Sequence, residues 1–368
     1  MKALEYNGPG LKALEDWPKP NLNSPTDAIV KITKTTICGT DLHILKGDVA
    51  TCKLGTVLGH EGVGVVDAVG SGVTTFKPGD HVLISCISAC GRCEPCRKGM
   101  YSHCTTGGWI LGNSIDGTQA EFVRIPHADT SLYPISKGAD EEALVMLSDV
   151  LPTGFECGVL NGKIQPGSTV AIVGSGPIGL AALLTAQFYA PSEIIMIEVD
   201  ESRLAAAKRF GATATVNSSN VVHSDTARQV MALTGGRGVD TAIEAVGIPA
   251  TFTLCEDIVA AGGTIAKVGL DADQVRVRGP AHGRLARAKR AHDRLSACRP
   301  LRRRRARASI AARAVGATAG WSPASRRSRP RATTASLSMP STSCSAPSAA
   351  VKRSTRGAGY SAWKNPVS

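Results

Sequence analysis

The pattern of apolar and polar positions changes its period between the two halves of the chain. Residues 28–37 alternate well enough to predict a strand, and residues 76–82 open another. Gly and Pro residues separate these short segments. Short strands punctuated by turn residues predict a small β-barrel domain in the first half.

The second half alternates apolar strands with helices. The segment 177–189 is apolar without strand alternation and begins with Pro, which is typical of a helix start. We expect strands at 168–173, 193–198, 239–244 and 263–269, and helices at 177–189 and 201–210. Strands that alternate with helices predict a parallel, doubly wound sheet, so the fold class is α/β.

Charge divides the chain at about residue 270. The net charge is +12, but residues 1–270 hold 20 Lys+Arg and 27 Asp+Glu (−7), whereas residues 271–368 hold 22 and 3 (+19). An acidic body is thus joined to a basic tail. The first residues contain no apolar signal core, and we expect no stretch long enough to span a bilayer. Eleven cysteines then favour metal binding in a reducing, cytoplasmic compartment.

Four cysteines stand close together in a segment that contains Gly and Pro. Cys90, Cys93, Cys96 and Cys104 have the spacing C-x2-C-x2-C-x7-C. Thiolates this close in sequence can converge on one tetrahedral Zn2+ ion, and four sulfurs leave no open position. A disulfide pair or unrelated free thiols are the alternative. We predict a structural zinc.

A second set of metal ligands is spread more widely. Cys38 and His60 offer a thiolate and an imidazole, and a catalytic zinc needs about three protein ligands and one open position. Asp149 is the third candidate, and Glu61 could be an exchangeable ligand or lie behind the ligands. On spacing alone, a buried cysteine and a surface histidine are the simpler interpretation.

A glycine-rich turn lies between a predicted strand and a predicted helix. In G-x-G-x-x-G, Gly174 permits the tight turn, Gly176 lets a pyrophosphate approach the backbone, and Gly179 lets helix and strand pack. Glu198, at the end of the next strand, is placed to hold a ribose 2′-hydroxyl and to repel a 2′-phosphate, so NAD is favoured over NADP. Asp200 competes for this role, and a solvent-facing Glu198 is the alternative.

The motifs C-G-T-D-x-H, G-H-E-x-x-G-x-V and K-P-G-D-x-V, followed by the four-cysteine lobe, resemble those of the zinc-dependent medium-chain alcohol dehydrogenases. The segment S-D-x-L-P-T-G-F resembles the branch of formaldehyde-dehydrogenase-like and secondary-alcohol enzymes, in which Asp is the third zinc ligand. The resemblance covers residues 1 to about 270. It implies a GroES-like catalytic domain at 1–149 and an incomplete Rossmann NAD-binding domain at 150–270.

The resemblance also implies roles for single residues. Thr40 corresponds to a relay hydroxyl that bonds the substrate oxygen, and His43 to the solvent end of that relay. Thr153, Val246 and Val268 correspond to the nicotinamide side, although they could equally be packing residues. The position of Arg203 often lies along the adenosine, but a solvated helix charge is nearly as good an interpretation. Trp109, Leu111 and Ile87 could line the substrate pocket or belong to the core.

The implied activity is hydride transfer from a small primary or secondary alcohol to NAD+, with two zinc ions per chain. Formaldehyde-adduct, threonine and polyol oxidation stay open as alternatives. With an intact C-terminus, the family would form a homodimer or homotetramer. No membrane partner is expected.

Residues 271–368 do not continue the resemblance. They contain no Phe, no Glu and a single Ile, and are rich in Arg, Ala, Ser and Pro. We expect disorder there, an exposed sheet edge after 263–269, and a frameshift in preference to a genuine fused tail. The hypothesis from a different class is an inactive or moonlighting protein whose basic tail binds nucleic acid.

Overall fold

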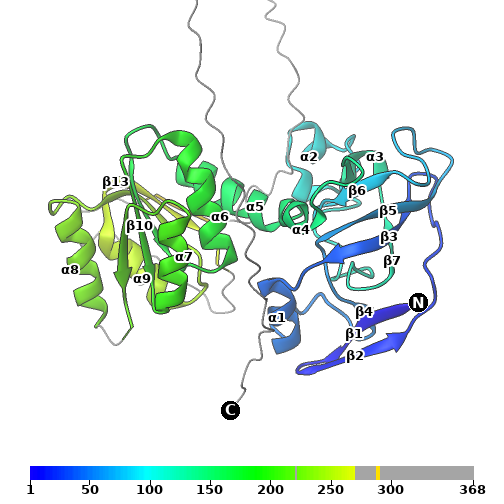
Figure 1. Ribbon diagram of the computed structural model, residues 1–368, viewed down its shortest axis with the longest axis horizontal. Helices are drawn as coiled ribbons and strands as arrows, with labels where there is room; N and C mark the ends of the chain where they lie inside the picture. Colours follow the sequence, from blue (N-terminus) through cyan, green and yellow to red (C-terminus); the bar gives the residue numbers. More distant parts are fainter. Residues whose placement is uncertain (220–221, 270–286, 291–368) are drawn as a thin grey trace, which may run out of the picture. The chain divides into compact units, whose positions relative to one another are not determined.

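The computed structural model describes residues 1–219, 222–269 and 287–290 (Figure 1). The expectations of disorder, of a frameshift and of a nucleic-acid-binding tail concern residues 271–368. Apart from the backbone of 287–290, those expectations lie outside the described residues.

Strands dominate the first domain, as its pattern predicts. They form a three-stranded sheet in the order β2-β1-β4 and a five-stranded antiparallel sheet in the order β7-β3-β5-β6-β8. The strands are β1 (Lys2–Gly8), β2 (Leu11–Asp16), β3 (Ala28–Thr35), β4 (Thr56–Val57), β5 (Gly62–Val69), β6 (His81–Ile84), β7 (Phe122–Ile125) and β8 (Leu132–Pro134). The larger sheet buries apolar side chains such as Val30, Val66 and Val123 in one cluster.

Helix α1 (Gly39–Lys46) begins at the C-G-T-D motif, for a local reason. The carboxylate of Asp41 accepts a hydrogen bond from the backbone N–H of Cys38 (2.8 Å), which satisfies a donor at the helix start. Gly47, with φ of 86°, ends the helix in the left-handed conformation. The motif therefore fixes Cys38 at the first turn of α1.

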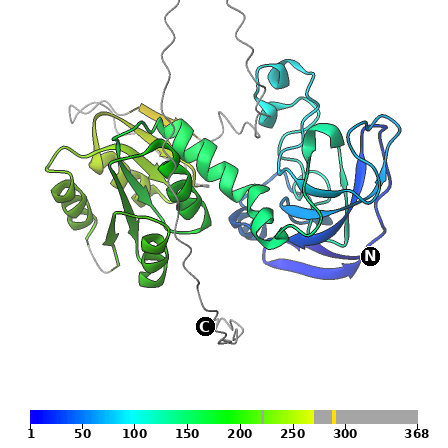
Figure 2. The ribbon, with the colours of Figure 1, turned by 45° about the horizontal axis from the view of Figure 1, so that its top comes forward.

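Short helices follow one another from Glu141 to Leu160 and form one run (Figure 2). By length and composition this run could cross a membrane, so the expectation that no stretch is long enough was wrong. Val145 nevertheless packs in a core cluster with Val63 and Leu83 of the first domain. The run comprises α4 (Glu141–Leu144), η2 (Val145–Leu147), α5 (Val150–Thr153) and the π-helix η3 (Gly154–Leu160). The other short helices of the first domain are α2 (Glu94–Arg97), η1 (Tyr101–His103) and α3 (Ala128–Ser131).

The second domain is a parallel sheet in the order β11-β10-β9-β12-β13-β14, as the strand–helix alternation predicts. Its strands are β9 (Thr169–Val173), β10 (Glu193–Glu198), β11 (Ala214–Asn217), β12 (Val239–Glu244), β13 (Val259–Lys267) and β14 (Arg287–Arg290). Its helices are α6 (Pro177–Ala186), η4 (Gln187–Tyr189), α7 (Glu201–Arg209), α8 (His223–Leu233) and α9 (Pro249–Ile258).

Both faces of this sheet are buried, which explains the unbroken apolar runs in its strands. On β9, Ala171 and Val173 pack in a cluster with residues of α8 and α9. Val170 and Ile172 point to the opposite face and pack with residues of α6 and α7. Successive side chains of one strand thus serve two helical layers.

Helix α6 lies close to η3 because two glycines permit it. A Cβ on Gly154 would lie 2.7 Å from the Cβ of Ala181, and one on Gly158 would lie 3.3 Å from the Cβ of Ala182. Both contacts would be closer than ordinary packing distances. The glycines therefore fix the spacing of η3 from α6.

The sheet does not end where the sequence suggested. Strand β14 pairs in parallel with β13, and Thr264 lies opposite Arg287. The predicted exposed edge after residues 263–269 was therefore wrong. The strand was missed because an Arg-rich segment lacks the apolar pattern that marks the other strands of this sheet.

Candidate active site and metal centres

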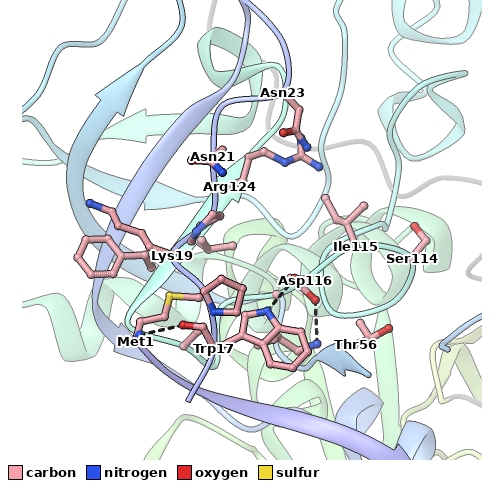
Figure 3. Close-up of a pocket in the computed structure, with 17 residues that line it drawn as sticks. Met1, Trp17, Lys19, Asn21, Asn23, Thr56, Ser114, Ile115, Asp116 and Arg124 are labelled. Atoms are coloured by element: carbon pink, nitrogen blue, oxygen red, sulfur yellow. Dashed lines mark hydrogen bonds between the residues drawn. The ribbon is translucent and has the colours of Figure 1, made fainter. Parts of the chain in front are cut away.

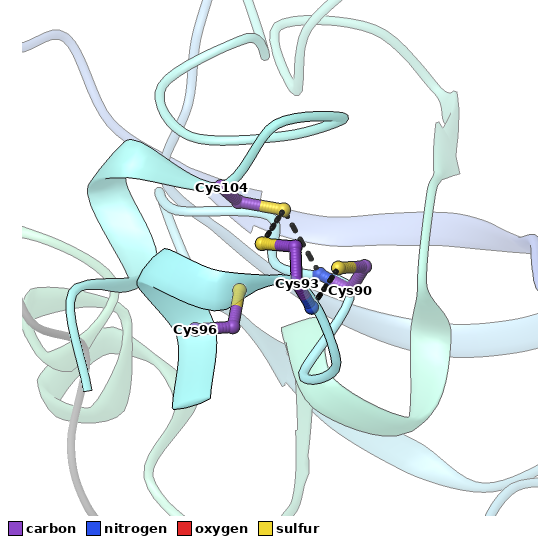
Figure 4. Close-up of side chains that lie close together, drawn as sticks. All are labelled: Cys90, Cys93, Cys96 and Cys104. Atoms are coloured by element: carbon purple, nitrogen blue, oxygen red, sulfur yellow. Dashed lines mark hydrogen bonds between the residues drawn. The ribbon is translucent and has the colours of Figure 1, made fainter. Parts of the chain in front are cut away.

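The four cysteines of the lobe converge as their spacing predicts (Figure 4). Their sulfur atoms all lie within 4.8 Å of one another, and every cysteine in the described part of the chain is a free thiol. Backbone N–H groups also point at the sulfurs: that of Cys90 donates to Cys104 Sγ (3.2 Å) and that of Cys93 to Cys90 Sγ (3.4 Å). Four convergent sulfurs supported by N–H donors fit a closed Zn2+ site.

The thiols of the lobe differ in their readiness to ionise. Backbone N–H groups of Thr105 and Cys96 lower the pKa of Cys93 to about 6. Burial, together with neighbouring thiols, raises the pKa of Cys96 to about 12. A divalent cation would favour the thiolate form of all four, because its charge replaces that of several protons.

A second cluster brings together Cys38, His60 and Asp149. One ligand atom from each residue lies within 4.8 Å of the others, although the residues are far apart in sequence. Cys38 precedes α1, His60 precedes β5, and Asp149 precedes α5. The Nε2 atom of His60 lies 3.3 Å from Oδ2 of Asp149. The spacing alone could not decide this convergence, which requires the folded domain.

The electrostatic character of this second cluster favours a cation. Burial opposes a charge on His60, but hydrogen bonds and charge interactions with Asp149 and Cys38 raise its pKa well above the usual value. Burial also raises the pKa of Glu61, which lies close enough for Asp149 to add to the effect. Several buried acidic groups around one imidazole would hold a divalent cation for the same reason that they hold a proton.

Two buried polar atoms behind His60 face each other without a hydrogen bond. Asp41 Oδ1 and His60 Nδ1 have no hydrogen-bond partner and lie 3.9 Å apart. The other oxygen of Asp41 accepts from the Cys38 N–H (2.8 Å) and from Gln119 Nε2 (3.0 Å). Metal-ligating histidines commonly donate their second ring N–H to a carboxylate. The arrangement fits a metal on Nε2 and was not foreseen from the sequence, although Asp41 stands in the C-G-T-D motif.

Three further side chains surround the carboxylate of Asp149. Thr153 Oγ1 donates to its Oδ1 (2.6 Å), and Cys86 Sγ lies 3.2 Å from the same oxygen. Glu61 bonds Thr36 through Oε2 and accepts from the Val150 N–H through Oε1 (3.2 Å). Glu61 thus lies beside the ligand cluster, attached to the start of α5. The sequence analysis missed Cys86, because no motif marks it.

The predicted relay residues lie on α1, which starts at Cys38. The hydroxyl of Thr40 is half-buried, 3.8 Å from Cys38 Sγ. His43 is 24% exposed, and its Nδ1 lies 2.8 Å from Oδ2 of Asp48. Asp48 thus fixes the orientation of the imidazole through Nδ1.

A small cavity adjoins Asp149. It is lined by Ser85, Cys86, Ile87, Tyr133, Leu147, Ser148, Asp149, Pro152, Thr153 and Glu156. Of the apolar residues that the sequence analysis considered, Ile87 lines this cavity, and Trp109 packs edge-on to His60 with ring centroids 6.3 Å apart. Leu111 is fully buried in the core of the five-stranded sheet, so it cannot line a pocket.

The glycine-rich turn has the conformation expected of a dinucleotide site. Gly174 has φ of 99°, a left-handed conformation that favours glycine. A Cβ on Gly176 would meet nothing within 4 Å, whereas a Cβ on Gly179 would lie 1.9 Å from the carbonyl oxygen of Gly174. The backbone of Gly176 therefore faces open space, where a ligand could approach it. The lack of a side chain at Gly179 lets helix α6 pack closely against the turn. Val246 packs against Gly174, and Val268 is partly buried beside the core.

The two carboxylates near this turn have different partners. Glu198 accepts from the Ser175 N–H (2.8 Å), so its side chain lies beside the glycine turn. Asp200 instead caps α7 and accepts from the N–H groups of Ser202 (2.7 Å) and Arg203 (3.1 Å). The guanidinium of Arg203 lies 3.8 Å from Glu198 and is mostly exposed. This geometry favours Glu198 over Asp200 for contact with a cofactor.

A larger cavity of about 460 Å3 lies elsewhere on the first domain (Figure 3). Several of its polar groups already have protein partners. Trp17 Nε1 donates to Asp116 (3.3 Å), and the Met1 ammonium donates to the carbonyl oxygen of Trp17 (2.9 Å). Arg124 bonds the carboxylate of Asp27 (3.0 Å). None of the residues in the two candidate metal groups of the described chain lines this cavity.

Two family models match the chain. The alcohol dehydrogenase GroES-like domain matches residues 24–137, and the zinc-binding dehydrogenase family matches residues 177–286. The first region contains Cys38, His60 and the four-cysteine lobe. The second contains the glycine-rich turn and extends to residue 286.

Individual proteins give the same result. An alcohol dehydrogenase from Cupriavidus necator H16 is 40% identical over 291 residues, which is 73% of this chain and 76% of that protein. The apo structure of zinc dependent alcohol dehydrogenase 2 from Streptococcus pneumonia is 53% identical, with a TM-score of 0.75, and covers 80% of this chain and 84% of its own. A zinc-binding dehydrogenase from Sinorhizobium meliloti 1021, solved with NADP, is 28% identical, with a TM-score of 0.68, over 78% and 83%.

Proposed function

The chain belongs to the zinc-type medium-chain alcohol dehydrogenases, and from that premise we propose that it oxidises a small primary or secondary alcohol with NAD+. The observation that carries the proposal is the convergence of Cys38, His60 and Asp149. Three protein ligands leave one position of a tetrahedral zinc open for a substrate oxygen. The four-cysteine lobe offers no such position, so we assign it a structural zinc.

The residues around the open position have separable tasks. When bound, zinc would supply Lewis-acid polarisation of the alcohol, and NAD+ would accept the hydride. The hydroxyl of Thr40 would accept a hydrogen bond from the substrate oxygen and, as a relay, would release its own proton toward solvent when it takes the substrate's proton. His43, oriented by Asp48, would exchange that proton with solvent through Nε2. Asp41 would orient His60 through Nδ1.

The choice between NAD and NADP depends on this chain's own residues, since one structural neighbour was solved with NADP. Glu198 lies beside the glycine turn and is 8% exposed. A carboxylate there would accept from a ribose 2′-hydroxyl and repel a 2′-phosphate. Its neighbour Arg203 could weaken that repulsion, but the 3.8 Å separation and the exposure of Arg203 limit the effect. We therefore propose NAD.

The family resemblance makes a small primary or secondary alcohol the first candidate substrate. The cavity beside Asp149 has a volume of only about 30 Å3 and is lined by both apolar and polar side chains, so it does not choose among substrates. Formaldehyde-adduct, threonine and polyol oxidation are the second candidates. We further propose a cytoplasmic location, since the described cysteines are free thiols. A homo-oligomer is proposed from the family resemblance alone.

The test is to express the full chain and measure NADH formation with ethanol, 2-propanol and sorbitol, together with zinc content. Turnover with the small alcohols and about two zinc ions per chain would support the proposal. The Cys38→Ser variant should lose about one zinc and nearly all turnover, whereas the control variant Cys255→Ser should keep both. Full zinc retention in Cys38→Ser would overturn the assignment of the catalytic site.

A further inference from the structure

We infer that Cys86 is a positioning residue for the metal ligand Asp149, and that together with Thr153 it directs one chosen carboxylate oxygen to the metal. The inference rests on the proposed zinc site at Cys38, His60 and Asp149. It adds a residue that no motif marks and that lies outside the ligand cluster.

The two oxygens of Asp149 have different surroundings. Oδ1 accepts from Thr153 Oγ1 (2.6 Å) and from the thiol of Cys86 (Sγ–Oδ1 3.2 Å). Oδ2 instead faces Nε2 of His60 at 3.3 Å. One oxygen is therefore occupied by two protein donors, and the other is turned toward the remaining ligands.

The backbone holds the thiol in place. Cys86 lies two residues after the end of β6, and its N–H donates to the carbonyl oxygen of Ser148 (3.2 Å). The hydroxyl of Ser148 is in turn hydrogen-bonded to both the N–H (3.1 Å) and the carbonyl (3.2 Å) of Gly62 in β5. Cys86 is only 7% exposed. The residue before Asp149 and the residue that contacts its carboxylate are thus fixed to the same sheet.

This arrangement determines how many coordination positions of a metal ion the carboxylate of Asp149 can occupy. A free carboxylate can ligate through one oxygen or through both. With Oδ1 engaged by two donors, Asp149 would ligate through Oδ2 alone. Three single-atom ligands then leave one position open for substrate, whereas two-oxygen ligation would crowd it.

Substitution at Cys86 tests the inference, with zinc affinity as the readout. In the full chain, competition with a chelator measures the zinc affinity of the site formed by Cys38, His60 and Asp149. The Cys86→Ala variant should lower this affinity by about 10–100-fold, which is the usual effect of losing a hydrogen-bond partner of a metal ligand. The Cys86→Ser variant keeps a donor and should recover part of that loss. The four-cysteine site serves as the internal reference, and Cys255→Ala controls for removal of a fully buried thiol.

The outcomes separate this inference from the proposed function. Unchanged zinc affinity in a folded Cys86→Ala variant overturns the positioning role and leaves the proposed function intact. Cadmium NMR counts the thiolates on the metal, so loss of a thiolate signal in Cys86→Ser would make Cys86 a ligand and also overturn the inference. If Cys38→Ser does not lower zinc content, the proposed site itself fails. If Cys86→Ala does not fold, Cys86→Ser and its cadmium spectrum decide.

Discussion

At the residue scale, one oxygen of Asp41 and one ring nitrogen of His60 are buried without a hydrogen-bond partner. A buried acceptor and a buried ring nitrogen 3.9 Å apart represent an unmade hydrogen bond. Leaving such groups unpaired costs roughly 1–3 kcal/mol each. Binding of a metal at Nε2 would fix the proton on Nδ1 and let this hydrogen bond form, so metal binding and ring orientation should stabilise each other.

The Asp41→Asn variant should lower the zinc affinity of the Cys38 site by about 10–100-fold. The amide oxygen can still accept from Cys38 and Gln119, so the start of α1 is kept while the acceptor facing His60 is lost. Chelator competition measures the effect, and the four-cysteine site should be unchanged. Equal weakening of both sites would mean that the variant damages the fold and not the ligand.

The Glu198→Gln variant should reduce the preference for NAD over NADP, because it removes the charge that repels a 2′-phosphate. The measurement is the ratio of the two kcat/KM values. Asp200→Asn is the matched control, since Asp200 caps α7 and does not bond the glycine turn. An unchanged ratio in Glu198→Gln would assign the selectivity to another group.

The sequence predicted some of these residues and not others. Cys90, Cys93 and Cys96 lie so close along the chain that their convergence follows from local geometry. Cys86 and Asp149 are 63 residues apart, and only the folded sheet brings them together. Roles that depend on such long-range contacts leave no local pattern to read.

At the scale of elements, two glycines in the turn between β9 and α6 have different structural roles. Gly176 faces open space, while Gly179 faces the carbonyl oxygen of Gly174. The sequence motif assigns these tasks, and the distances agree with the assignment. The apolar runs of β9 and β10 were also readable, because both faces of the sheet are covered. The π-helix η3 gave no signal, since its sequence reads as an ordinary helix.

Alanine at these two glycines should have opposite effects. Gly176→Ala should leave the thermal stability nearly unchanged but weaken NADH binding, since its new methyl group occupies the space of the pyrophosphate. Gly179→Ala should destabilise the domain by about 1–3 kcal/mol or more, because backbone must move to admit the Cβ. Thermal melts and fluorescence titration with NADH measure the two properties. Loss of stability in Gly176→Ala would contradict the assignment.

At the scale of the whole molecule, the hydrophobic core is divided into separate clusters. The four-cysteine lobe has a very small one, in which Ala89 and Tyr101 accompany the cysteines. Among the described residues, no member of the two candidate metal groups belongs to the clusters of the parallel sheet. The lobe therefore depends on its metal for order to a degree that the sheet does not.

Removal of zinc by a strong chelator should release the lobe while the parallel sheet persists. Hydrogen exchange followed by mass spectrometry should show lost protection in residues 89–107 and retained protection in β9 and β10. Loss of protection throughout would instead mean that the lobe's zinc supports the entire fold.

The helical run after Asp149 also restricts how this sequence could vary among relatives. Asp149 belongs to the metal cluster, whereas Gly154 and Gly158 fit closely against α6. Deleting one residue between Gly154 and Gly158 would rotate Gly158 by about 100° relative to Gly154 and Asp149. Substitutions at the exposed Leu160 should be tolerated. Insertions and deletions between residues 149 and 158 should be eliminated by selection. Among relatives, the length of this segment should therefore be more conserved than its sequence.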